Sequence, residues 1–182
     1  TRATLRGGEA PTVLARTLLR VFAHRPLMWA AMACARFLAA TPLPTLLMKL
    51  PGRMGFAMAM LASTDYPLER AKYRAEGDGS NGDAALLRGC VMEGLFTETN
   101  RATERVLTRN GYRMTAAPGQ GCCGALHAHA GDLEAARRLA RRNIAAFERS
   151  GARYVVTNAA GCGAMMKEYD HLLSGDPEWS AR

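Results

Sequence analysis

Apolar positions in the second half of the chain form short runs that alternate with helical stripes. Residues 84–88, 112–117 and 153–158 are short apolar runs with the length and composition of buried strands. Helical patterns follow them over residues 97–110, 132–150 and 164–175, with Thr97 and Asp132 as expected N-caps and Gly111 and Gly151 as expected helix ends. Strands and helices in this order predict an α/β fold, a small parallel sheet with flanking helices.

The first half of the chain has a different pattern. Helical spacing begins near Thr12 and returns over residues 27–40, whereas residues 41–60 are rich in Pro and Gly and are expected to wrap irregularly over a surface. The 27–40 segment has about 14 residues, short of the ~20 that cross a bilayer. We interpret it as a packing helix, with a helix at a membrane surface or against a partner protein as the alternative.

A stretch rich in Gly and Asp over residues 75–83 is the clearest linker in the sequence. It predicts a helical connector segment over residues 1–80 and an α/β domain over residues 81–182. The chain has 182 residues, of which 48% are hydrophobic, so it can bury a substantial core. No secretory leader is visible, and we therefore expect a cytoplasmic protein with reduced cysteines.

The net charge of +8 is carried almost entirely by arginine. Such a charge favours an acidic partner, a nucleic acid or anionic lipid without choosing among them. The arginines of residues 137–142 lack the interleaved aromatic side chains that stack on bases, so we interpret them as a solvated helix face and expect no nucleic-acid partner.

The five cysteines supply the candidate chemistry. Cys122 and Cys123 lie between two glycines in a loop, and Cys90 and Cys162 each follow one of the other predicted strands. Ligands of parallel sheets bind beyond the carboxyl ends of the strands, so these four thiols are expected to lie close together. Cys34 falls in the first helical half, where we expect a small core residue without a functional role.

Four thiolates are the ligands that an iron–sulfur cluster needs, and a thiolate is favoured where it precedes a helix, as expected for Cys123 and Cys162. Backbone N–H groups of four flanking glycines could bind the cofactor by donating to its sulfur atoms: Gly121, Gly124, Gly161 and Gly163. Zinc is the alternative metal, although its structural sites usually pair ligands two to four residues apart. A third option is four small buried residues without a cofactor.

Several neighbouring side chains are weaker candidates. His127 and His129 follow the paired cysteines but are left out of the ligand set, because a histidine in an early helical turn is more often a surface or supporting group. Lys167, Glu168 and Tyr169 are candidate partners of a bound anion, although a plain helix face also explains them.

The sequence also resembles a known family. The resemblance lies in Gly89-Cys90, residues 99–107, Gly121 to Ala125, residues 140–144, and Ala160 to Ala164 with Lys167-Glu168-Tyr169. These segments are similar to the iron–sulfur subunit of bacterial glycolate oxidase and, more broadly, to the cysteine-rich CCG domain. That domain also occurs in heterodisulfide reductase, lactate-utilisation proteins and the anaerobic glycerol-3-phosphate dehydrogenase iron–sulfur subunit. The resemblance covers about residues 84–175, and residues 1–80 match only loosely as a helical connector.

The resemblance implies a 4Fe-4S cluster held by Cys90, Cys122, Cys123 and Cys162. It also implies an electron path from a flavin subunit that oxidises glycolate toward a membrane acceptor. FAD is expected on that flavin-containing oxidase partner and not on this chain. Association with the inner membrane surface is a further implied option, and the alternative is a non-redox docking module that binds zinc or no metal.

The sequence departs from the family pattern in three ways. Cys162 stands alone, with Ala159 and Met165 where a Cys-x-x-Cys pair would place its second thiol, so a five-cysteine noncubane cluster would lack a ligand while one cubane would not. Ferredoxin-type cysteine runs before residue 1 and a second CCG copy after residue 182 are absent. We therefore expect an internal fragment or a reduced relative that does not turn over substrate alone.

Overall fold

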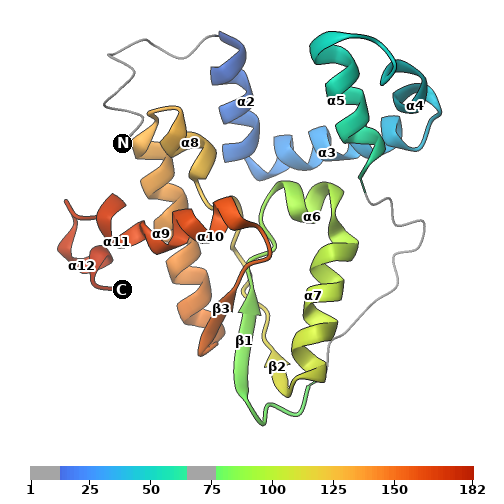
Figure 1. Cartoon of the computed structure of the whole chain (residues 1–182). Coiled ribbons are helices and arrows are strands. Elements are labelled where there is room, and N and C mark those ends of the chain that lie inside the picture. The colour runs from blue at the N-terminus through green and yellow to red at the C-terminus, as the bar shows by residue number, and fades with distance from the viewer. Residues whose placement is uncertain (1–12, 65–76) are drawn as a thin grey trace.

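A computed structural model describes residues 13–64 and 77–182 (Figure 1). The expected start of the first helix at Thr12 and the first two residues of the predicted linker lie outside the described residues. Within the described residues, four helices gather at one end of the molecule, and a sheet with its own helices forms the remainder.

The sheet has three parallel strands, β1 (Gly82–Leu86), β2 (Tyr112–Met114) and β3 (Tyr154–Val156), in the order β2-β1-β3. Ala84 of the central strand aligns with Met114 on one side and with Tyr154 on the other. The predicted α/β fold is confirmed. The outer strands are shorter than their apolar runs because the chain leaves the ladder after Met114 and Val156 to form the loops at the carboxyl end of the sheet.

Seven helices follow or separate these strands within residues 77–182. They are α6 (Val91–Leu95), α7 (Thr97–Arg109), α8 (Ala125–His129), α9 (Leu133–Ser150), α10 (Ala160–Lys167), α11 (Tyr169–Leu172) and α12 (Pro177–Ser180). Figure 1 shows α7 and α9 on opposite sides of the sheet. Together they supply the helical layers that the alternating pattern predicted.

The helix ends test the capping predictions. The Asp132 side chain accepts a hydrogen bond from the Ala135 N–H at 3.1 Å, and Gly151 ends α9 with a φ of 66°, so both predictions are confirmed. The N-cap predicted at Thr97 is wrong: Phe96 occupies that position. The Thr97 hydroxyl instead donates to the Glu93 carbonyl at 2.7 Å, which joins the start of α7 to α6.

The first half of the chain contains α2 (Val13–Ala23), α3 (Arg25–Ala39), α4 (Leu43–Leu47) and α5 (Gly52–Ala62). The irregular wrap expected over residues 41–60 is wrong, since these residues contain α4 and most of α5. Pro44 is tolerated because it lies in the first turn of α4, where a missing N–H costs nothing. Within the described residues, no helix combines the length and the apolar character needed to cross a membrane.

Helix α3 packs directly on the sheet domain. Met28 and Met32 are buried in one apolar cluster with Cys90, Cys122 and Leu139, and Gly94 of α6 lies so close to Met32 that a Cβ there would clash with its side chain. The core position expected for Cys34 is wrong, since Cys34 is exposed. Two residues after Met32, it faces the opposite side of α3. The domain boundary at residue 80 stays a prediction. Helix α3 is more than a connector, because it contributes Met28 and Met32 to the core of the sheet domain.

Candidate metal centre

Four cysteines converge at the carboxyl end of the sheet. Cys90 follows β1 at the start of α6, Cys122 and Cys123 lie between β2 and α8, and Cys162 lies in the first turn of α10 after β3. The Sγ atoms of Cys123 and Cys162 are 3.3 Å apart, and the Cys122 thiol donates a hydrogen bond to Cys90. The structure thus brings the four thiols together, whereas their role as ligands stays a prediction.

Hydrogen bonds among the thiols set their protonation. The pKa of Cys123 is lowered to about 3, because hydrogen bonds with the thiol of Cys122 and then with that of Cys162 favour its thiolate. The same bonds raise the pKa of Cys122 and of Cys162, since each holds a shared proton, and burial adds to both shifts. A bond from Cys122 lowers the pKa of Cys90. Cys123 is therefore the preferred thiolate of the set.

The four glycines differ in what their N–H groups can do. Gly124 donates toward the Cys122 Sγ at 3.5 Å, and Gly161 lies in the first turn of α10, where N–H groups have no intrahelical acceptor. Gly121 already donates to the Asn143 Oδ1 at 2.9 Å, and Gly163 donates to the Ala159 carbonyl at 2.9 Å. Cofactor contacts stay untested for all four, but only Gly124 and Gly161 keep donors that face or are open to a bound group.

Asn143 and Tyr169 hold the backbone of the paired cysteines. The fully buried Asn143 amide accepts from the Gly121 N–H and donates to the Cys122 carbonyl at 2.9 Å and to the Tyr169 hydroxyl at 3.1 Å. The Tyr169 hydroxyl in turn donates to the Cys123 carbonyl at 2.9 Å. Reasoning from sequence missed this role for Asn143. The signal was a polar residue three positions after Ala140 on the apolar stripe of α9.

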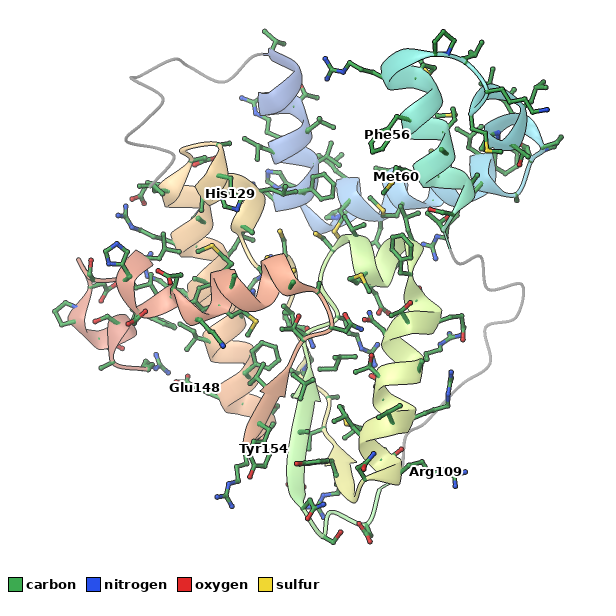
Figure 2. All side chains as sticks on the ribbon, in the orientation of Figure 1. Phe56, Met60, Arg109, His129, Glu148 and Tyr154 are labelled. Atoms are coloured by element: carbon green, nitrogen blue, oxygen red, sulfur yellow. The ribbon has the colours of Figure 1, made fainter. Side chains whose placement is uncertain are left out.

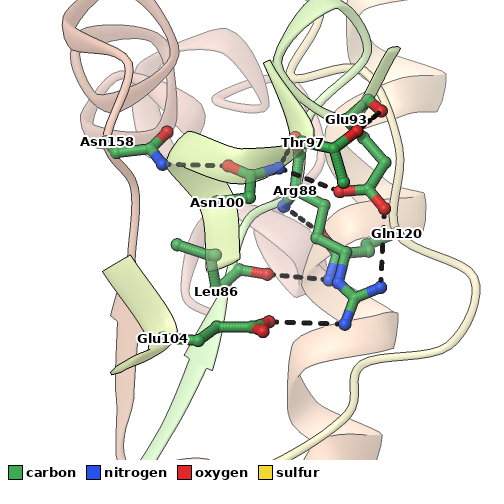
Figure 3. Close-up of polar contacts among 8 residues, drawn as sticks. All are labelled: Leu86, Arg88, Glu93, Thr97, Asn100, Glu104, Gln120 and Asn158. Atoms are coloured by element: carbon green, nitrogen blue, oxygen red, sulfur yellow. Dashed lines mark hydrogen bonds and ion pairs between the residues drawn. The ribbon is translucent and has the colours of Figure 1, made fainter. Parts of the chain in front are cut away.

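A second polar network positions Cys90 (Figure 3). The Gln120 side chain accepts from the Arg88 N–H at 2.8 Å and donates to the Leu86 carbonyl at 2.9 Å, which ties the end of β1 to the residue before Gly121. The buried Asn100 donates to the Arg88 carbonyl at 3.1 Å and to the Glu93 carboxylate at 2.9 Å. Both sides of the Gly89-Cys90 turn are therefore fixed by hydrogen bonds.

The other candidate side chains differ in where they lie. His127 is buried with its Nε2 3.0 Å from the Leu19 carbonyl, so it joins α8 to α2, while His129 is exposed. Lys167 and Glu168 are exposed, and Tyr169 is buried against the cysteine loop, so their role as partners of an anion stays a prediction. A cavity of about 260 Å³ lies beside Cys90, between Met28 and Trp29 of α3 and Arg88 after β1.

The donor set fits an iron–sulfur group in chemistry, since four thiols converge, three of them buried, and the N–H groups of Gly124 and Gly161 lie beside them. Across residues 13–64 and 77–182, no three His, Cys, Asp or Glu side chains are arranged to hold a single metal ion as they stand. A separation of 3.3 Å also leaves no space for an inorganic core between Cys123 and Cys162. Any bound group must therefore move these two sulfur atoms apart.

Comparison with known proteins finds relatives that match about half of this chain. The probable glycolate oxidase iron-sulfur subunit of Bacillus subtilis is 50% identical over 98 residues. This match covers 54% of this chain and 22% of that protein. The glycolate oxidase iron-sulfur subunit of Escherichia coli is 40% identical over 50% of this chain and 23% of its own length. Lactate utilization protein A of Geobacillus kaustophilus is 37% identical over 53% of this chain and 40% of its own.

The chain spans less than half the length of each of these relatives. No solved structure matches the chain. The family model described as a cysteine-rich domain, CCG, matches residues 84–167, a segment that includes most of the sheet and all four converging cysteines. Residues 84–167 of this chain are therefore similar to the CCG cysteine-rich domain, and the chain is similar to glycolate oxidase iron-sulfur subunits.

Proposed function

We propose that this chain is an electron-transfer module that holds a 4Fe-4S cluster through Cys90, Cys122, Cys123 and Cys162. The observation that carries the proposal is the convergence of three loop tips, which bring the four thiols to the carboxyl end of the sheet. The similarity to glycolate oxidase iron-sulfur subunits and to lactate utilization protein A supports this class of cofactor. A bound cluster would supply one-electron storage and transfer.

The chain's own residues supply the conditions that such a cofactor needs. The low pKa of Cys123 provides a thiolate, the form that binds iron. The N–H groups of Gly124 and Gly161 can donate to sulfur atoms, which raises a reduction potential. The buried side chains of Met28 and Met32 pack against Cys90 and Cys122.

Within this proposal, the module works in a complex that oxidises a small 2-hydroxy acid such as glycolate. Electrons leave FAD on a flavin-containing oxidase subunit, pass through this chain and continue toward a membrane acceptor. The names of the relatives support the glycolate assignment, and alone the chain is not expected to oxidise a substrate.

Anaerobic reconstitution with iron and sulfide tests the proposal. The chain should bind about four iron and four sulfide and absorb near roughly 400 nm, with bleaching and an EPR signal on reduction. Cys122→Ser should lose most of the iron. Cys34→Ser is the matched control, because Cys34 is exposed on α3 outside the site, and its iron content should equal that of the original chain. A folded chain that stays colourless, or equal iron loss in both variants, contradicts the proposal.

Zinc binding in a non-redox docking module is the second candidate. A zinc–sulfur bond of about 2.3 Å places the sulfur atoms of a tetrahedral site about 3.8 Å apart, close to the 3.3 Å seen for Cys123 and Cys162. Metal analysis after anaerobic purification separates the two. One zinc per chain with no sulfide would favour this candidate over a cluster.

A further inference from the structure

A cavity of about 550 Å³ lies between α2 and the turn that joins α8 to α9, and we call it the α2–α8 cavity. Its volume falls within the range of small-molecule sites, roughly 300–1,000 Å³. No cysteine of the described residues lines it, so it is separate from the candidate metal centre. Figure 2 shows the region: His129 of α8 lies toward the end of the molecule that holds α2, whereas Arg109 and Tyr154 lie at the opposite end.

Positive charge reaches the α2–α8 cavity from two helices. Arg20 lies on α2, and His24 follows one helical turn later, with its N–H donating to the Arg20 carbonyl at 3.1 Å. Arg138 lies on α9. All three side chains are exposed, and none of them forms an ion pair with a described residue. Two guanidinium groups at one cavity favour an anionic ligand, because each can bind carboxylate or phosphate oxygens with paired N–H donors.

His127 adds an unused acceptor to the wall of this cavity. The residue is 1% exposed, and its Nε2 lies 3.0 Å from the Leu19 carbonyl. A carbonyl oxygen only accepts, so Nε2 carries the proton of this bond and Nδ1 is the acceptor of a neutral ring. The buried Nδ1 has no hydrogen-bond partner among the described residues. Such an atom is costly to leave unpaired, so a ligand hydroxyl group that donates to it favours the bound state.

The other lining residues narrow the class of ligand. Asp132 accepts from the Ala135 N–H at 3.1 Å, and its carboxylate has further lone pairs for a hydroxyl group. No Phe, Tyr or Trp of the described residues lines the cavity, so a nucleotide base would lack an aromatic side chain on which to stack. Water can satisfy single acceptors but does not neutralise two guanidinium groups. Guanidinium groups and hydroxyl acceptors in one cavity therefore fit a compact anion that carries hydroxyl groups.

We propose that the α2–α8 cavity binds a small hydroxylated anion of the sugar phosphate or sugar acid class. The anionic group contacts Arg20 and Arg138, and a hydroxyl group donates to the Nδ1 of His127. Because neighbouring atoms cover Nδ1, the hydroxyl group reaches it after a small movement of side chains. The bound anion joins α2 to α9. This site needs no metal cluster, so it stands or falls separately from the electron-transfer function.

Isothermal titration calorimetry tests the proposal on the 182-residue chain, both metal-free and reconstituted. The probes are ribose 5-phosphate and gluconate, which carry hydroxyl groups with a phosphate or a carboxylate, and inorganic phosphate. At least one of the first two should bind with a Kd of about 1 mM or below, and about tenfold more tightly than inorganic phosphate. The tighter of the two identifies the anionic group. If neither binds, or neither binds more tightly than inorganic phosphate, the proposal is overturned.

Arginine variants locate the binding site. Arg138→Ala should weaken binding of the tighter probe about tenfold or more, because charge-assisted hydrogen bonds are lost, and Arg20→Ala should act in the same direction. Arg109→Ala is the matched control, since it also removes one exposed arginine from a helix but at the opposite end of the molecule. It should bind as the original chain does. Equal affinity of the Arg138 and Arg109 variants overturns the proposal.

The contact to His127 is tested without a substitution, because replacing a buried side chain also changes stability. The chain has four histidines, so nitrogen NMR can follow each imidazole ring. A saturating amount of the tighter probe should shift the Nδ1 resonance of His127, since a hydrogen bond to that atom is gained. The exposed His171, which does not line the cavity, should keep its resonances. An unchanged Nδ1 resonance of His127 overturns the hydroxyl contact and with it the proposed class of ligand.

Discussion

Asn143 shows how one buried amide can define a loop. Each of its hydrogen-bonding groups has a partner, and all three partners belong to the cysteine loop or to Tyr169, which also holds that loop. A residue used so completely is costly to replace, since its loss leaves several buried groups without partners. At this scale the paired cysteines depend on a side chain about 20 positions further along the chain.

We expect Asn143→Ala to lower the free energy of unfolding of the metal-free chain by about 2–4 kcal/mol, because the Gly121 N–H and the Cys122 carbonyl lose their partners. Urea denaturation followed by circular dichroism measures the change. The exposed Asn110→Ala serves as the control and should cost about 0.5 kcal/mol or less. Equal losses in the two variants would mean that the Asn143 network contributes no stability.

At the scale of elements, the cysteine loop and α8 are pressed onto α9. Gly124 has a φ of 89°, and a Cβ there would lie 3.3 Å from the Cα and the carbonyl oxygen of Ala136. Gly131 has a similar φ of 84° but nothing within 4 Å of its Cβ position. The two glycines share the same backbone requirement and differ only in the contact with α9.

Gly124→Ala should therefore destabilise the chain more than Gly131→Ala does. Both substitutions force alanine into the left-handed region, which costs about 1–2 kcal/mol. Only Gly124→Ala also presses on α9, which raises its loss to about 3 kcal/mol or more. Thermal or urea unfolding of both variants gives the difference directly. If their free energies of unfolding are equal, the close approach of residue 124 to Ala136 does not affect stability.

The sequence predicted the strand and helix order well, because the sheet half alternates short apolar runs with clear helical stripes and capping residues such as Asp132. The prediction fails over residues 41–60, where Pro and Gly suggest breaks in the chain although Pro44 lies in the first turn of α4 and Gly52 begins α5. The convergence of the cysteines followed from parallel topology, since each lies after a strand. Contacts such as Asn143 to Gly121 or Met32 to Gly94 depend on packing between distant segments, which local pattern does not encode.

For the whole molecule, the buried Met28 and Met32 make the helical half and the sheet half share one core. These two side chains pack in the same cluster as Cys90, Cys122 and Leu139, so loss of α3 would expose the cysteine site. Halves that share a core are expected to unfold together, whereas a loosely attached connector would unfold first.

Cooperative unfolding can be measured through Trp29 after the only other tryptophan is removed by Trp179→Phe. Trp29 fluorescence and circular dichroism should then change at the same urea concentration. In this background Met32→Ala should cost about 2–5 kcal/mol and shift both signals together, because it leaves a cavity between the halves. Met60→Ala, on the exposed face of α5, should shift neither. A fluorescence change at clearly lower urea would identify two independent units.

The short distance between the Cys123 and Cys162 sulfur atoms has a practical consequence for anyone who handles the protein. A covalent bond between two sulfurs is about 2.05 Å long, so only a small movement separates this hydrogen-bonded pair from a cross-link once air removes two electrons. A chain stored without reductant would then present two thiols where the proposed cluster needs four. Its failure to take up iron would reflect its storage rather than its sequence.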